Sequence, residues 1–269
     1  MLKNEGNRLT CVIVCTPHHE YALGKNDSAH NLGDLGNPQE AIAQHDLLKS
    51  ALKKFGSEVI DLPELDGHPN SVFTRDTAVM TPEGFIQLRL GINSRLGEGD
   101  WMSETLSNLG LPLAGHISSP GTVDGGDVVL AGNVAFVGQS TRTNPEGIRQ
   151  LSAILEPMGY EMRVIPLPNN ILHLDKVLLT IAPDTLLYCP NYVPKEMVSG
   201  FQTVEIECGG NTTANMICLG DNEVLVNQSN KDVIEKLQER GMTVHVLDLE
   251  EFAKGMGGPN CLIMPIERV

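Results

Sequence analysis

Cys261 has the type and the setting of a catalytic nucleophile. It follows the turn-forming segment 257–260 (Gly-Gly-Pro-Asn) and directly precedes an apolar run, residues 262–266. Glycine accepts positive φ and proline fixes φ, so this segment predicts a tight turn that leads into a short buried strand. A cysteine at such a junction is held rigidly and can still face a cleft. Taken by itself, Cys261 fits a buried and inert thiol better than a nucleophile, because free cysteine is among the most buried residue types.

Titratable residues precede three other predicted hairpins. Phe73-Thr74-Arg75-Asp76 comes before the first, Asp124-Gly125-Gly126-Asp127 before the second, and His173-Leu174-Asp175 before the third. Each has an ordinary structural alternative. Asp-Gly is common turn chemistry, a lone histidine is often structural, and an acid next to an arginine can form a solvated ion pair.

The elements that must position these residues form a repeat. A hairpin, a helix and a strand follow one another in the same order along the chain, and turn residues separate them. The predicted hairpins cover residues 77–90, 128–138, 177–188 and 216–227, and the helices that follow begin near residues 98, 145, 194 and 231. A helix from Pro38 and strands at residues 11–16 and 57–63 make the first unit, which residues 261–266 complete. The repeat predicts a single α/β domain over residues 1–269, closed by its two ends, with the helices outside.

Equivalent positions of a closed ring meet at one end of its axis, so these residues should converge. Cys261 would then be the nucleophile, His173 would move protons, and Asp124 would orient the histidine. Asp76 and Asp175 remain as surplus acids, which would raise the pKa of a thiol and repel a carbonyl oxyanion. They suit a cation instead, because carboxylates grip a planar guanidinium in a fork. The pattern favours a guanidinium substrate.

Two arginines occupy matching places after their hairpins. Arg95 follows Gly91-Ile92-Asn93-Ser94, and Arg142 follows Gly138-Gln139-Ser140-Thr141. Their equivalence suits a carboxylate of the substrate that both guanidinium groups bind. The alternative is that each arginine pairs with an acid at the surface.

The composition excludes other classes of protein. The formal net charge of −15 argues against a nucleic-acid surface. We find no signal peptide and no apolar window long enough to span a membrane. The six cysteines lack paired CxxC spacing, which indicates reduced thiols in a cytoplasmic protein and no zinc site. We expect no metal or cofactor, and a homodimer by default.

The ordered motifs FTRD, DGGD, STRTN, HLD and GGPNC resemble the guanidino-group-modifying superfamily, the five-bladed α/β propellers called penteins. The resemblance implies a catalytic set of Cys261, His173 and Asp124. It places guanidinium binding on Asp76 and carboxylate binding on Arg95 and Arg142. It also implies a covalent S-alkylthiouronium intermediate that water hydrolyses. We further assign Phe73, Asp127 and Asp175 to substrate binding.

Within this superfamily the chain is similar to two branches. Its length, without an inserted helical domain, resembles the dimethylarginine dimethylaminohydrolases. That branch usually carries Asp at Asn70, Val-Glu at Thr74-Arg75, and Lys at Asp175, whereas FTRD, HLD and GGPNCLIMPIER resemble arginine deiminases. Both imply hydrolysis of an arginine-type substrate to citrulline. Residues 24–37 resemble a lid over the site.

Two other functions compete with hydrolysis. An amidinotransferase would pass the same intermediate to an amine, but the chain shows no acceptor module. The pentein ribosome anti-association factor is not an enzyme, and it lacks the Cys–His–Asp set that this chain keeps. A strongly acidic chain also disfavours RNA.

Overall fold

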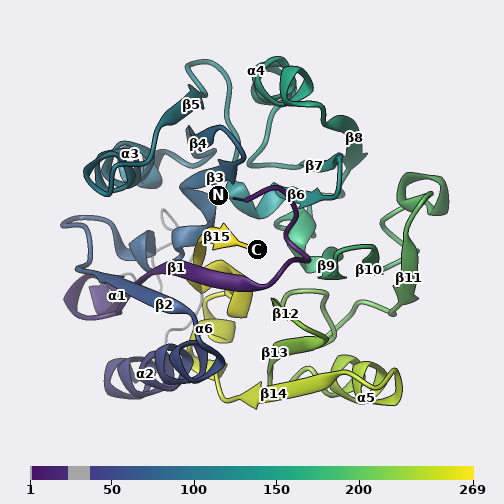
Figure 1. Ribbon diagram of the computed structural model, residues 1–269. Coiled ribbons are helices and arrows are strands. Elements are labelled where there is room, and N and C mark those ends of the chain that lie inside the picture. Colours follow the sequence, from purple (N-terminus) through teal and green to yellow (C-terminus); the bar gives the residue numbers. More distant parts are fainter. Residues whose placement is uncertain (1, 24–36) are drawn as a thin grey trace.

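The first strand of every hairpin lies nearest the common centre of five sheets (Figure 1). The structure, a computed structural model, describes residues 2–23 and 37–269. The predicted lid falls mostly on residues 24–36 and so lies outside the described residues. No helix in the described ranges is long and apolar enough to cross a membrane.

Each sheet has three strands, and in each an antiparallel pair is extended by a parallel third strand. In order from the inner strand they are β15 (Met264–Arg268), β1 (Leu9–Cys15) and β2 (Glu58–Leu62); β3 (Ala78–Thr81), β4 (Gly84–Gln87) and β5 (Leu113–His116); β6 (Val128–Ala131), β7 (Val134–Gln139) and β8 (Glu161–Pro166); β9 (Leu178–Ala182), β10 (Thr185–Tyr188) and β11 (Gln202–Glu205); and β12 (Ile217–Gly220), β13 (Glu223–Asn227) and β14 (Thr243–Leu247). The predicted α/β class and the repeat of five units are confirmed.

The chain ends pair as the repeat predicts. β1 runs antiparallel to β15, with Val12 opposite Pro265 and Ile13 opposite Met264, and it runs parallel to β2 on its other edge. One sheet therefore joins strands from both ends of the chain.

The longer helices α2 (Pro38–Phe55), α3 (Glu98–Asn108), α4 (Pro145–Leu155) and α5 (Lys231–Glu239) lie around the outside of the five sheets (Figure 1). The short helices are α1 (His19–Leu23) and α6 (Glu250–Lys254), and α6 lies nearer the centre, against α2. Asn37 caps α2 by accepting from the amide of Gln39, Pro38 takes the first helical position, and Gly56 ends the helix at φ 108°.

The fourth unit differs from the prediction. The expected helix near residues 194–200 is a 3-10 turn, η7 (Lys195–Val198). Pro194 precedes the turn, and Gly200 follows it with φ 91°, so the segment is too short for an α-helix.

Burial explains why the inner strands read as apolar runs. All residues of β3, β6 and β12 are buried, whereas the outer strands β2, β5 and β14 contain exposed positions. The hairpin between β12 and β13 turns through Asp221 (φ 51°) and Asn222 (φ 64°), two residue types that tolerate positive φ. The inner strands thus form a rigid base for the segments that precede them.

Candidate active site

Four 3-10 turns at the start of inner strands bring the site residues together. They are η2 (Thr74–Asp76), η4 (Gly125–Asp127), η6 (Leu174–Lys176) and η8 (Pro259–Leu262). η2 packs against both η8 and η4, and η4 packs against η6. Positions that are equivalent in the repeat therefore lie next to one another.

A small cavity of about 30 Å³ lies among these turns. Among the residues that the structure describes, the cavity is lined by Asn70, Phe73, Asp76, Arg95, Arg142, Leu172, His173, Gly255, Met256, Gly257 and Cys261. Six of the nine residues predicted from the sequence reach it directly. Asp124, Asp127 and Asp175 are not in this lining.

Cys261 faces the cavity from η8. The amide of Asn215 donates to its Sγ at 3.3 Å. A side chain at Gly258 would place its Cβ 2.2 Å from Oδ1 of Asn215, so this approach requires glycine. Burial raises the pKa of Cys261 to about 11; Lys176 opposes this, and Asp175 and Asp76 reinforce it. The thiol is therefore protonated at neutral pH unless another cation enters.

His173 lies between two carboxylates. Its Nε2 is 3.0 Å from Oδ2 of Asp124, and its Nδ1 is 3.8 Å from Oδ1 of Asp76. Burial lowers the pKa of His173, but Asp76, Asp124 and Asp127 outweigh burial and raise it to about 9. The ring is thus an imidazolium at neutral pH, able to give a proton to a leaving nitrogen.

Asp124 is placed to orient this ring, as the sequence predicts. Its Oδ1 accepts from the amide of Gly91 at 2.8 Å, which leaves Oδ2 for the histidine. Gly126, two residues after Asp124, makes room for the ring, because a Cβ at this position would lie 2.7 Å from Nδ1 of His173. Asp124 therefore fixes the ring from behind the cavity.

Asp76 is the ionised acid of the cavity. Its Oδ2 accepts from Nη1 of Arg95 at 2.6 Å, and its Oδ1 accepts from the amide of Gly126 at 3.0 Å. Burial raises its pKa, but His173, Arg95 and the Gly126 amide bring it down to about 2. The alternative that Asp76 forms a solvated ion pair with the neighbouring Arg75 is wrong, because Arg75 forms a buried ion pair with Glu5.

The two arginines meet at the cavity, but both already contact acids. Arg95 donates to Glu98 from Nε at 2.9 Å and from Nη2 at 2.7 Å, in addition to its bond with Asp76. Nη1 of Arg142 lies 3.6 Å from Oδ2 of Asp124. Because both side chains are buried, the alternative of surface ion pairs is wrong.

The assignment of Asp127 to substrate contact needs correction. Its Oδ2 accepts from the hydroxyls of Ser140 and Thr143, both at 2.6 Å, and its Oδ1 accepts from the amide of Leu174 at 2.9 Å. Burial raises its pKa to about 7. Asp127 thus ties the His173 segment to the segment that carries Arg142.

Asp175 lies behind Cys261. Its Oδ2 accepts from Asn215 at 2.8 Å and from Asn260 at 3.1 Å, and it is 3.8 Å from the sulfur. Its buried Oδ1 has no hydrogen-bond partner in the described part of the chain. An acceptor is thus left over next to the nucleophile.

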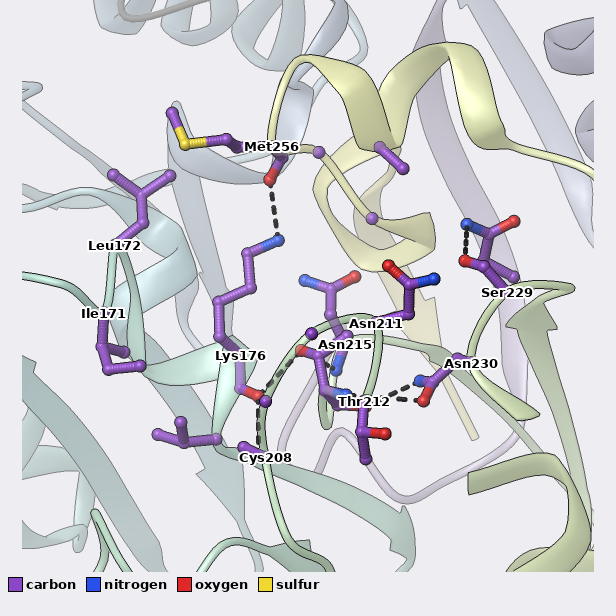
Figure 2. Close-up of a pocket in the computed structure, with 18 of the residues that line it drawn as sticks. Ile171, Leu172, Lys176, Cys208, Asn211, Thr212, Asn215, Ser229, Asn230 and Met256 are labelled. Atoms are coloured by element: carbon purple, nitrogen blue, oxygen red, sulfur yellow. Dashed lines mark hydrogen bonds between the residues drawn. The ribbon is translucent and has the colours of Figure 1, made fainter. Parts of the chain in front are cut away.

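Sequence reasoning missed Lys176. Its Nζ donates to the carbonyl of Met256 at 3.0 Å and to Sγ of Cys261 at 3.6 Å. Lys176 and Asn215 line a second cavity of about 450 Å³, whose lining includes several other amide and hydroxyl side chains (Figure 2). The available signal was position: Lys176 is in the same short turn as Asp175.

The histidine gives the protein a pH-dependent stability. Its folded pKa of about 9 exceeds the ordinary 6.5, so its stabilisation is complete below pH 6.5 and is lost as pH rises to 9. We expect a loss of about 3 kcal/mol in unfolding free energy across this window. The unfolding free energy, measured by urea unfolding at several pH values, should fall less steeply with pH in His173→Gln than in the parent protein. The variant His245→Gln should keep the pH dependence of the parent. Equal slopes in all three proteins would contradict this assignment.

Comparison with known proteins agrees with this arrangement. A family model for N,N dimethylarginine dimethylhydrolase, eukaryotic, matches residues 29–268. The N(G),N(G)-dimethylarginine dimethylaminohydrolase of Pseudomonas aeruginosa is 32% identical over 253 residues, covering 93% of this chain and 97% of that protein. The crystal structure of the P. aeruginosa enzyme, as a cysteine-to-serine mutant with citrulline, has a TM-score of 0.84 at 29% identity and covers 96% and 99% of the two chains.

A more distant structure shares the fold alone. The N-terminal domain of the cyanobacterial arginine dihydrolase ArgZ, bound to substrate, has a TM-score of 0.83 at 18% identity and covers 96% and 98% of the two chains. The predicted membership in the guanidino-modifying superfamily is confirmed. The chain belongs to the N,N-dimethylarginine dimethylhydrolase family, and it is an enzyme of the hydrolase class that this family represents.

Proposed function

We propose that the protein hydrolyses the guanidino C–N bond of an arginine-type substrate, giving citrulline and ammonia or an alkylamine. The observation that carries the proposal is the small cavity that holds Cys261, His173 and Asp76 together. A thiol, an imidazolium and an ionised carboxylate match the needs of a cationic, planar substrate. The P. aeruginosa relative, whose structure holds citrulline, supports the same reaction.

The first half of the reaction forms a covalent intermediate. The guanidinium binds against Asp76, and the thiol of Cys261 loses its proton to water. The sulfur then attacks the guanidinium carbon and forms a C–S bond. His173 gives its proton to the leaving nitrogen, the C–N bond breaks, and ammonia or an alkylamine departs. An S-alkylthiouronium remains on Cys261.

The second half returns the enzyme. His173 is neutral after the first half of the reaction, so it can accept a proton from water. The resulting hydroxide adds to the same carbon. The C–S bond then breaks, so that the sulfur leaves as thiolate, the added hydroxyl loses its remaining proton to water, and the ureido group of citrulline forms. Asp124 holds the ring of His173 in place through both proton transfers. Arg142 would face the carboxylate end of the substrate from the cavity wall, whereas Arg95 is held against Asp76 and Glu98.

We expect unmethylated arginine to be preferred over asymmetric dimethylarginine. A dimethylated guanidinium presents fewer N–H donors to the acids near Cys261. Asp76 lines the cavity, and Asp175 stands behind the sulfur with an Oδ1 that has no partner among the described residues. The measurement is kcat/KM for citrulline formation from each compound. We expect a preference of about tenfold or more, since one charge-assisted hydrogen bond contributes about 1.5–3 kcal/mol. Asp175→Asn should reduce the preference.

The same assay separates the competing reactions. A strong preference for the dimethylated compound would overturn the role of Asp175 and leave hydrolysis standing. Citrulline formed without an added amine supports a hydrolase. Product that appears only with an added amine acceptor would indicate amidinotransfer instead.

A further inference from the structure

Lys176 brings a positive charge to the nucleophile from outside the substrate cavity. Its Nζ lies 3.6 Å from Sγ of Cys261, and Figure 2 shows the side chain extended past Asn215 toward Met256. The backbone of Lys176 is held separately, because its carbonyl accepts from Ala214 N and Thr213 Oγ1, both at 2.8 Å. The position of the ammonium thus depends on the side chain, whereas the local chain path does not.

The charges around the sulfur are unbalanced without this lysine. Asp175 and Asp76 raise the pKa of the thiol, and Lys176 lowers it. The other charged or titratable groups at the same cavity are His173, Arg95 and Arg142. Arg95 and Arg142 contact acids, and His173 lies between Asp76 and Asp124. Among the described cations, Lys176 is the one that donates directly to the sulfur.

The ammonium also holds the backbone beside the sulfur. Its second bond is to the carbonyl of Met256, whose φ of 61° is uncommon for a residue with a side chain. Met256 lines both the substrate cavity and the larger cavity of about 450 Å³. Lys176 therefore fixes the wall between the two cavities.

We propose that Lys176 is a positioning residue for the nucleophile: its ammonium holds a positive charge against Sγ of Cys261 from outside the substrate cavity. That Cys261 is the nucleophile rests on the proposed function. The ammonium–sulfur contact exists in the free protein, so it can be tested without a substrate.

The test is alkylation of Cys261 in the free protein by iodoacetamide between pH 6 and 10. Peptide mass spectrometry reports modification at this cysteine apart from the other five. At a pH below the thiol pKa, the alkylation rate follows the fraction of thiolate. A rise of about one in the pKa of Cys261 therefore slows the reaction about tenfold. We expect this slowing in Lys176→Met. Lys176→Arg keeps the charge and should stay within about threefold of the parent. Lys195→Met, at an exposed position, should change nothing.

A second neutral variant separates charge from structure. Lys176→Gln can still donate a hydrogen bond toward Met256 but carries no charge. If it reacts as slowly as Lys176→Met, the charge carries the effect. If Lys176→Gln reacts as fast as the parent protein, the proposal is overturned. Where Lys176→Met does not fold, the measurement on Lys176→Gln is the decisive one. A parent-like pH profile in Lys176→Met would also overturn it. Neither result depends on citrulline formation, so failure of the proposed reaction remains distinguishable.

Discussion

Cys261→Ser should lower citrulline formation by about 10⁴-fold or more, because a hydroxyl replaces the sulfur that forms the covalent bond. The side chain is buried and accepts from Asn215, which a serine oxygen can also do, so the fold should persist. Acid-quenched intact-mass spectra of the parent protein should contain a substrate-derived adduct. The serine variant should show none.

Cys218→Ser is the matched control. Cys218 is also buried and free, but it lies in β12 and its thiol contacts the carbonyl of Gly6. This variant should keep both turnover and adduct, with at most a modest loss of stability. Turnover of Cys261→Ser within tenfold of the parent would refute the assignment of the nucleophile.

Deletion of residues 262–269 should prevent stable folding. The deletion removes β15, exposes an edge of β1, and removes the buried side chains of Leu262, Ile263, Met264 and Ile266. Each of these contributes about 1.5–3 kcal/mol by burial, so the sum approaches the 5–15 kcal/mol that stabilises a typical domain. Thermal unfolding followed by circular dichroism should show no cooperative transition.

Point substitutions in β15 and at the residue after it provide graded controls. Ile266→Ala should cost about 2–5 kcal/mol of unfolding free energy, as expected for a truncated core residue. Val269→Ala should be neutral, because that side chain is exposed and its backbone still pairs with Arg8. A soluble truncation with the parent's melting temperature would show that the pairing of β1 with β15 is dispensable.

The repeat could be predicted from the sequence because the inner strands β3, β6 and β12 are buried along their whole length, and β9 and β15 at all but one position. Residues 128–131 and 217–220 read as apolar runs between turn residues, and their order is sufficient to align the five units. The sequence predicts too long a helix in the fourth unit, since Pro194 and Gly200 leave room for a single 3-10 turn. Turn residues at both ends of a short segment are a better guide to its length than its composition.

The site was predictable in its members and less so in its contacts. The common position of Asp76, His173 and Cys261 before inner strands indicated that they converge. Sequence spacing could not show that Asp127 turns away from the cavity to accept from Ser140 and Thr143. It could not find Lys176 either, because its ammonium reaches the sulfur through a long side chain whose direction is set by Met256.

The pairing of β1 with β15 also sets an order of events during synthesis. The ribosome makes β1 early, and β1 can pair with β2 while its other edge stays open. An unpaired strand edge can associate with other chains, so the nascent protein is most prone to aggregate between the synthesis of β1 and the synthesis of β15. Protection by chaperones would be needed during this interval. Cys261 emerges after β14, the last element of the other four sheets. A nascent chain therefore carries no nucleophile at this site until its acid-lined surroundings have been made.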